Sequence, residues 1–336
     1  MFILAPPRTG STSLHRALLS DRTRFFAPQT CELFFPFITL SKLLHYLHNR
    51  PRLLRPVQAC MDWFVSWVGI QASEVSQRHP MGLFKEDEDD ITLTVHHLTS
   101  EICWCAVSHI ESWLWGCHLH RLPAHTQRRS ALYLTRVYQT VAFCRGQGRT
   151  LCTKSHLVGL RPALEALHPT ARFVTTVRPA EGVFPSFWSL QCAISRDFGR
   201  IDSRGVSYRD MRLAFLSELH AELRRQFGDG LAPRRRVITF QNFTADAATE
   251  LAELYAGWGI SVDRSALERR VGRYMAEEEH AHGFGNASWA EIGVRRQDVA
   301  KLVQCPMLTY AALNKPAAMA PAGAGESEPL RRSPRR

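Results

Sequence analysis

Four short apolar runs, rich in β-branched residues, lie at wide intervals along the chain. They occupy residues 2–5, 149–154, 171–177 and 236–240. Runs of this length, bounded by proline or polar residues, predict buried strands. The clearest is 171–177, because its Val and Thr residues are typical of strands.

Between these runs, apolar residues recur at the three- and four-residue spacing of helices. Leu14, Ala17 and Leu18, for example, fall on one face of a predicted helix that starts near Ser11. Since strands and helices alternate, we predict one α/β domain, with a parallel sheet of about five strands and helices on both faces. The other helices are predicted at about 38–68 with breaks at Pro51 and Pro56, at 91–119, 124–147 and 157–167, around Val183, Ser186 and Phe187, and at 244–258 and 264–275.

The composition changes near the C-terminus. From Lys315 onward the residues are mostly Pro, Ala, Gly, Ser and Arg, which cannot bury enough apolar area to fold. We therefore expect a folded domain over 1–315 and a disordered basic tail over 316–336. The whole chain carries a formal net charge of +11, which suits an anionic ligand such as a phosphate-rich cofactor.

The nine cysteines are scattered without a C-x-x-C pair, which is typical of reduced, cytoplasmic proteins. The His-rich pairs lack partners at zinc spacing, so no metal site is expected. The apolar start, Met1 to Ala5, is too short for a signal peptide or a membrane span. A Golgi or membrane anchor is expected only if residues upstream of Met1 are missing.

The segment Pro6-Pro7-Arg8-Thr9-Gly10-Ser11-Thr12-Ser13 joins the first strand to the first helix. A phosphate is held by backbone N–H groups at a helix start, a small residue for close approach and a cation, and this segment contains all of them. Alternatively, Ser11 is only an N-cap and Arg8 a surface residue. The segment is not a Walker A motif, because no Gly precedes Gly10 at the required spacing.

The stretch FILAPPRTGSTSLHRAL resembles the 5′-phosphosulfate loop of sulfotransferases that use 3′-phosphoadenosine 5′-phosphosulfate (PAPS), in the branch with Arg at the cationic position. The resemblance implies a fold like that of P-loop nucleotide kinases and PAPS as co-substrate. The residues that it would assign to the 5′-phosphosulfate are Arg8, Thr9, Gly10, Ser11, Thr12 and Ser13.

A second part of the resemblance follows the strand that ends at Val177. Arg178 is followed eight residues later by Ser186, the spacing with which this family binds the 3′-phosphate of the donor. The guanidinium would contact the phosphate oxygens, and the hydroxyl would donate from the next helix. Here Pro179 follows the Arg directly, one residue earlier than is usual in the family.

Two residues are candidates for the base that deprotonates the acceptor. Lys154-Ser155-His156-Leu157 resembles the Lys-Thr-His-Leu segment of cytosolic sulfotransferases, in which the His is the base. Glu32 lies in a segment similar to the Glu-x-x-Phe of the Golgi-type branch, in which the Glu is the base. We predict His156, because an ordinary imidazole is largely neutral at pH 7.

The resemblance implies transfer of the sulfuryl group to a hydroxyl or amine of a small-molecule or glycan acceptor, with Lys154 and Arg8 stabilising the charge that develops. An alternative is an ATP-dependent small-molecule kinase, although the P-loop Lys is missing. Another is a non-catalytic binder of nucleotides or nucleic acid. We expect no nucleic-acid partner, and no pattern in the sequence assigns an oligomeric state.

Overall fold

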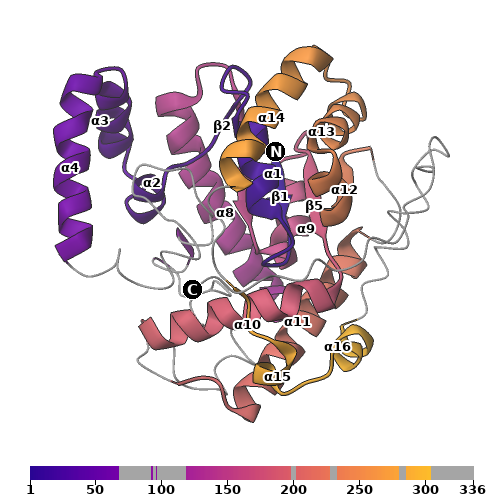
Figure 1. Cartoon of the computed structure of the whole chain (residues 1–336). Coiled ribbons are helices and arrows are strands. Elements are labelled where there is room, and N and C mark those ends of the chain that lie inside the picture. The colour runs from indigo at the N-terminus through magenta and orange to yellow at the C-terminus, as the bar shows by residue number, and fades with distance from the viewer. Residues whose placement is uncertain are drawn as a thin grey trace, which may run out of the picture.

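The computed structural model describes residues 1–67, 92–93, 96, 119–197, 202–227, 233–279 and 285–303. Its main sheet has four parallel strands in the order β4-β1-β5-β6. This arrangement, with helices on both faces (Figure 1), confirms the predicted α/β class. The four strands are β1 (Phe2–Leu4), β4 (Thr153–Ser155), β5 (Phe173–Val177) and β6 (Arg235–Thr239).

A second parallel pair extends this sheet. The strands β2 (Phe25–Phe26) and β3 (Thr150–Leu151) pair with each other, and β3 leads into β4 through Cys152 alone. The Cys152 amide donates to the Phe26 carbonyl at 2.8 Å, and the Thr153 amide donates to the Met1 carbonyl at 3.0 Å. One continuous stretch therefore joins β2 on one side to β1 on the other. The main sheet itself has four strands, against about five predicted, and β2 was not among the predicted strands.

Both faces of the sheet are buried because helices cover them, and the residues of each strand alternate between the two faces. Ile3 and Val174 contribute to one core, which also contains residues of α1, α13 and α14. Phe2 and Phe173 contribute to the other core, with α8, α9, α10 and α11. The rings of Phe2 and Phe173 stack at 5.2 Å between centroids.

The helices follow the sequence prediction in most places. They are α1 (Ser11–Leu19), α2 (Thr30–Phe34), α3 (Ile38–His48), α4 (Pro51–Trp67), α8 (Ala124–Val141), α9 (Arg161–Leu167), α10 (Ala180–Asp197), α11 (Val206–Phe227), α12 (Phe240–Ala245), α13 (Ala247–Ala256), α14 (Arg264–Glu279), α15 (Trp289–Ile292) and α16 (Arg296–Leu302). Short turns of other helix types are η2 (Leu119–Arg121), η3 (Ala142–Gly146, a π-helix) and η4 (Val158–Leu160).

Several helix predictions differ from the structure. The short helices α2, α15 and α16 were not predicted, and the helix predicted at 124–147 is α8 followed by the π-helix η3. The predicted break at Pro56 is wrong, because α4 continues through it. Both Pro56 and Arg52 are exposed, so water can reach the Arg52 carbonyl that lacks its usual N–H partner. The helix α11 was not predicted, although Met211, Phe215 and Leu219 repeat at every fourth position.

Two further predicted regions fall outside the described residues. Most of the helix predicted at 91–119 lies there, as does the tail over 316–336. Within the part of the chain that the structure describes, no helix is long and apolar enough to cross a membrane.

Candidate active site

The predicted site residues follow the carboxyl ends of different strands. Arg8 comes after β1, His156 after β4 and Arg178 after β5. Because these strands are parallel, their carboxyl ends meet at one edge of the sheet, which is where open α/β sheets bind their ligands. Phe240 follows β6 at the same edge, and the sequence analysis did not include it among the site residues.

The loop from Ala5 to Gly10 makes a sharp turn into α1. Arg8 has φ 64° and Gly10 has φ 90°, both in the left-handed region. A Cβ at Gly10 would lie 2.5 Å from Cδ2 of Phe240, so the approach of that ring requires glycine. Gly10, and not Ser11, is the N-cap of α1 and makes no side-chain capping bond, so the alternative assignment of Ser11 as N-cap is wrong.

The Thr9 side chain points into the protein interior. Its hydroxyl donates to the Pro6 carbonyl at 2.7 Å and lies 2.8 Å from the hydroxyl of Thr176, which therefore donates to it. Thr9 is fully buried. The hydroxyl of Thr9 thus stabilises the loop against β5, and among the atoms of Thr9 the backbone amide is the better candidate for a ligand contact.

The two predicted anchors for the donor phosphates are in contact. The Arg8 Nε donates to Ser186 Oγ at 2.8 Å, across 178 positions of sequence. The Arg178 Nη1 approaches the Arg8 carbonyl at 3.5 Å. The structure therefore brings the three predicted residues Arg8, Ser186 and Arg178 together.

The Arg178 side chain is packed between the loop and α12. Its guanidinium lies 4.3 Å from the centre of the Phe240 ring. Burial lowers the pKa of Arg178 from its ordinary value. A guanidinium that has lost part of its water gains more from an anionic partner than an exposed one does.

Lys154 approaches the loop from the neighbouring strand. It is almost completely buried, and its Nζ donates to Thr12 Oγ1 at 2.8 Å. Its Cα pairs in register with Ile3 of β1, which places it directly beside the strand that leads into the loop. A second cation thus lies at the start of α1, in addition to Arg8.

The backbone fixes one ring nitrogen of His156. Its Nδ1 lies 2.8 Å from the Ala5 carbonyl, which can only accept, so Nδ1 carries the proton. In the neutral imidazole the lone pair is then on Nε2. His156 is largely buried, and its partner Ala5 comes directly before the loop. A neutral His156 therefore has its basic nitrogen at Nε2, which is the form that a general base requires.

Both carboxylate oxygens of Glu32 contact other groups of the protein. It is fully buried in α2, where its Oε2 accepts from the Gln29 amide at 2.9 Å in a capping box. Its Oε1 lies 3.5 Å from Nε of Arg145, a residue of the π-helical turn η3 that also donates to the Ala27 carbonyl. These contacts stabilise the start of α2 and connect it to η3.

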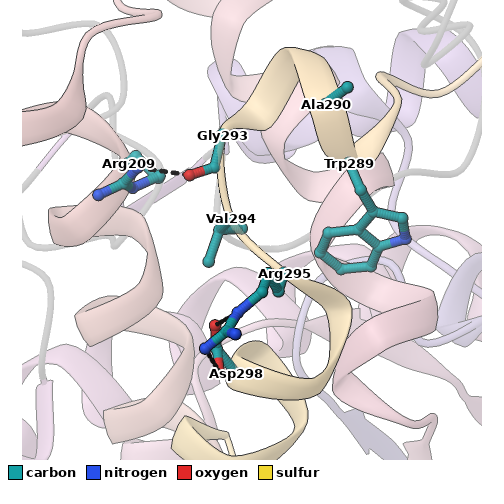
Figure 2. A pocket seen from close by; sticks show the side chains of 7 residues that line it. All are labelled: Arg209, Trp289, Ala290, Gly293, Val294, Arg295 and Asp298. Atoms are coloured by element: carbon teal, nitrogen blue, oxygen red, sulfur yellow. Dashed lines mark hydrogen bonds and ion pairs between the residues drawn. The ribbon is translucent and has the colours of Figure 1, made fainter.

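A cavity of about 540 Å³ opens between α11 and the α15–α16 segment (Figure 2). The Arg209 guanidinium donates to the Gly293 carbonyl at 2.7 Å, and Arg295 forms a two-point ion pair with Asp298. None of the predicted site residues lines this cavity, so we do not assign the reaction to it. It is lined by Arg209, Trp289, Ala290, Gly293, Val294, Arg295 and Asp298.

Comparison with known proteins gives the following matches. The sequence model of the sulfotransferase family matches residues 1–264. No curated protein matches the chain. Among solved structures, a sulfotransferase from Mycobacterium tuberculosis is 18% identical with a TM-score of 0.65, covering 90% of this chain and 75% of its own. Another from Mycobacterium avium is 14% identical with a TM-score of 0.66, covering 93% of this chain and 76% of its own. At these identities the structures show a shared fold.

Proposed function

Since the chain belongs to the sulfotransferase family, we propose that it transfers the sulfuryl group of PAPS to a hydroxyl or amine of an acceptor. The observation that supports this most directly is the contact between Arg8 and Ser186. PAPS has a phosphosulfate and a separate 3′-phosphate, so it needs two neighbouring anion sites, and this contact brings the two predicted sites together.

In the proposed reaction, the acceptor oxygen or nitrogen attacks sulfur and the bond from sulfur to the bridging oxygen breaks. Adenosine 3′,5′-bisphosphate leaves, and the acceptor proton moves to Nε2 of His156. Arg8 and Lys154 stabilise the negative charge that develops on the bridging oxygen and the leaving phosphate. The backbone of the loop from Thr9 to Ser13 binds the 5′-phosphate, with the hydroxyls of Ser11, Thr12 and Ser13 nearby. Arg178 and Ser186 bind the 3′-phosphate.

The donor assignment is tested by titration calorimetry with adenosine 3′,5′-bisphosphate, AMP and ATP with Mg²⁺. We expect the bisphosphate to bind at least about tenfold more tightly than AMP, the scale of one charge-assisted hydrogen bond. Equal affinities for the bisphosphate and AMP would contradict a 3′-phosphate site. Tight binding of ATP that depends on Mg²⁺ would instead favour the kinase alternative.

Replacing Arg8 by Ala is expected to weaken bisphosphate binding by about 1.5–3 kcal/mol, because a charged hydrogen-bond donor is lost. Arg22→Ala, at an exposed arginine just beyond α1, is the matched control and should leave the affinity unchanged. Unchanged affinity in a folded Arg8→Ala protein would remove Arg8 from the site.

A further inference from the structure

The exposed apolar side chains of this protein gather in one region. Among the described residues there are twelve large hydrophobic side chains that are exposed, and nine of them lie between Phe35 and Trp63 or at Phe143. The most exposed of these nine are Phe143 at 71%, Trp63 at 65% and Phe37 at 60%. Single exposed apolar residues are ordinary, but a cluster of this size marks an interaction surface.

Six of these nine residues lie on the helix pair α3–α4, at the left edge of Figure 1. On α4, Leu53, Val57 and Cys60 are exposed and fall on one side of the helix, at spacings of four and three residues. On α3, Leu43 and Tyr46 are exposed. We call these two helices, together with Phe143 of η3, the α3–α4 surface.

Basic side chains are interleaved with the apolar ones. Lys42, Arg50, Arg52 and Arg55 are exposed, and no acidic residue occurs between Leu33 and Met61. The Arg50 guanidinium lies 3.8 Å from the centre of the Tyr46 ring, and Lys42 Nζ lies 5.4 Å from that of Phe143. Aromatic rings next to Lys and Arg are the residues that anchor proteins at the boundary between lipid headgroups and acyl chains.

We propose that the α3–α4 surface docks on a membrane that contains anionic phospholipids. The apolar side chains would enter the headgroup region while the four cations contact lipid phosphates, as in helices that lie in the membrane interface. The charge pattern argues against a second copy of this chain as the occupant, because two such surfaces would bring four cations against four, with Asp62 of α4 as the one acid of each surface.

The helix α2 connects β2 to α3 along the chain, and α3 packs against η3 and α8. The proposal rests on surface chemistry alone and does not require the reaction proposed above.

The test is co-sedimentation of the full chain with vesicles of phosphatidylglycerol and phosphatidylcholine, compared with vesicles of phosphatidylcholine alone. We expect binding to the anionic vesicles that decreases at high salt. Each Lys or Arg near a membrane contributes about fivefold in affinity, so the triple variant Lys42→Gln/Arg50→Gln/Arg52→Gln should bind about a hundredfold more weakly. The double variant Leu53→Ser/Trp63→Ser should lose at least about tenfold, because it removes apolar area.

The matched controls are Val206→Ser and Leu302→Ser, which remove exposed apolar side chains of α11 and α16. They should bind vesicles as the unmodified protein does. Calorimetry with adenosine 3′,5′-bisphosphate on each variant verifies the fold and the donor site separately. The proposal is overturned if anionic vesicles do not bind the protein, or if the controls lose as much as the α3–α4 variants. A dimer that is detected by ultracentrifugation and abolished by Leu53→Ser/Trp63→Ser would overturn it as well, since a second copy would then occupy the surface.

Discussion

Replacing His156 by Asn is expected to reduce turnover by about 10²–10⁴-fold, the usual contribution of a general base. Asn retains an N–H that can donate to the Ala5 carbonyl, as His156 Nδ1 does, but it has no basic nitrogen in place of Nε2. The loop should therefore keep its shape, and adenosine 3′,5′-bisphosphate should bind with nearly the same affinity. The measurement is steady-state turnover with PAPS and an acceptor identified by screening.

Glu32→Gln separates the two candidate bases. Because Glu32 pairs with Arg145 and caps α2, its loss is expected to lower the free energy of unfolding more than it lowers turnover. A folded His156→Asn protein with normal turnover would exclude His156 as base. A large loss of turnover in Glu32→Gln at normal stability would transfer the role to Glu32.

Acidification from pH 7 to pH 4 is expected to destabilise the protein partly through His220. This residue of α11 is 2% exposed, and neither of its ring nitrogens has a hydrogen-bond partner in the described structure. Burial lowers the pKa of His220 from 6.5 to about 4, with a smaller effect of Arg224. Between pH 6.5 and about pH 4, the His220 ring of the unfolded chain binds a proton that the same ring in the folded protein does not bind. The free energy of unfolding therefore falls as the pH falls through this range, by about 3 kcal/mol in total.

Urea unfolding at a series of pH values measures this effect. In His220→Leu that part of the pH dependence should disappear, and stability at pH 7 should not decrease much, because no hydrogen bond of the ring is lost. His125→Leu, at an exposed histidine of α8, is the control and should keep the full pH dependence. If the free energy of unfolding depended on pH identically in His220→Leu and in the unmodified protein, the prediction would be wrong, because protonation of His220 would then not oppose folding.

The strands of the main sheet could be predicted from the sequence to within about two residues, because strands buried on both faces appear as short apolar runs. β2 has only two residues, Phe25 and Phe26, and no pattern of that length is distinctive. α11 has apolar residues at every fourth position, but its buried side also carries Arg212, His220, Glu222 and Gln226, which weaken the contrast between its apolar and polar sides. The order of elements was therefore readable, whereas the shortest elements and some boundaries were not.

The candidate site was only partly predictable, because its contacts join distant positions. Motifs indicated Arg8 and Ser186 separately, but their hydrogen bond depends on how α10 packs beside the loop. The proximity of Phe240 to Gly10 and Arg178 had no local signal, because it arises from the pairing of β5 with β6. The ion pair of Glu32 with Arg145 likewise depends on the placement of η3, which the sequence did not predict as a π-helix.

The backbone of Arg8 has a consequence for engineering. An arginine at φ 64° occupies a conformation that only glycine adopts without strain, at a cost of about 1–2 kcal/mol. Selection for thermal stability alone would therefore favour glycine at this position and discard the guanidinium that contacts Ser186. Heat resistance and the proposed donor binding make opposite demands on Arg8, so a screen that aims to improve this protein has to assay both properties together.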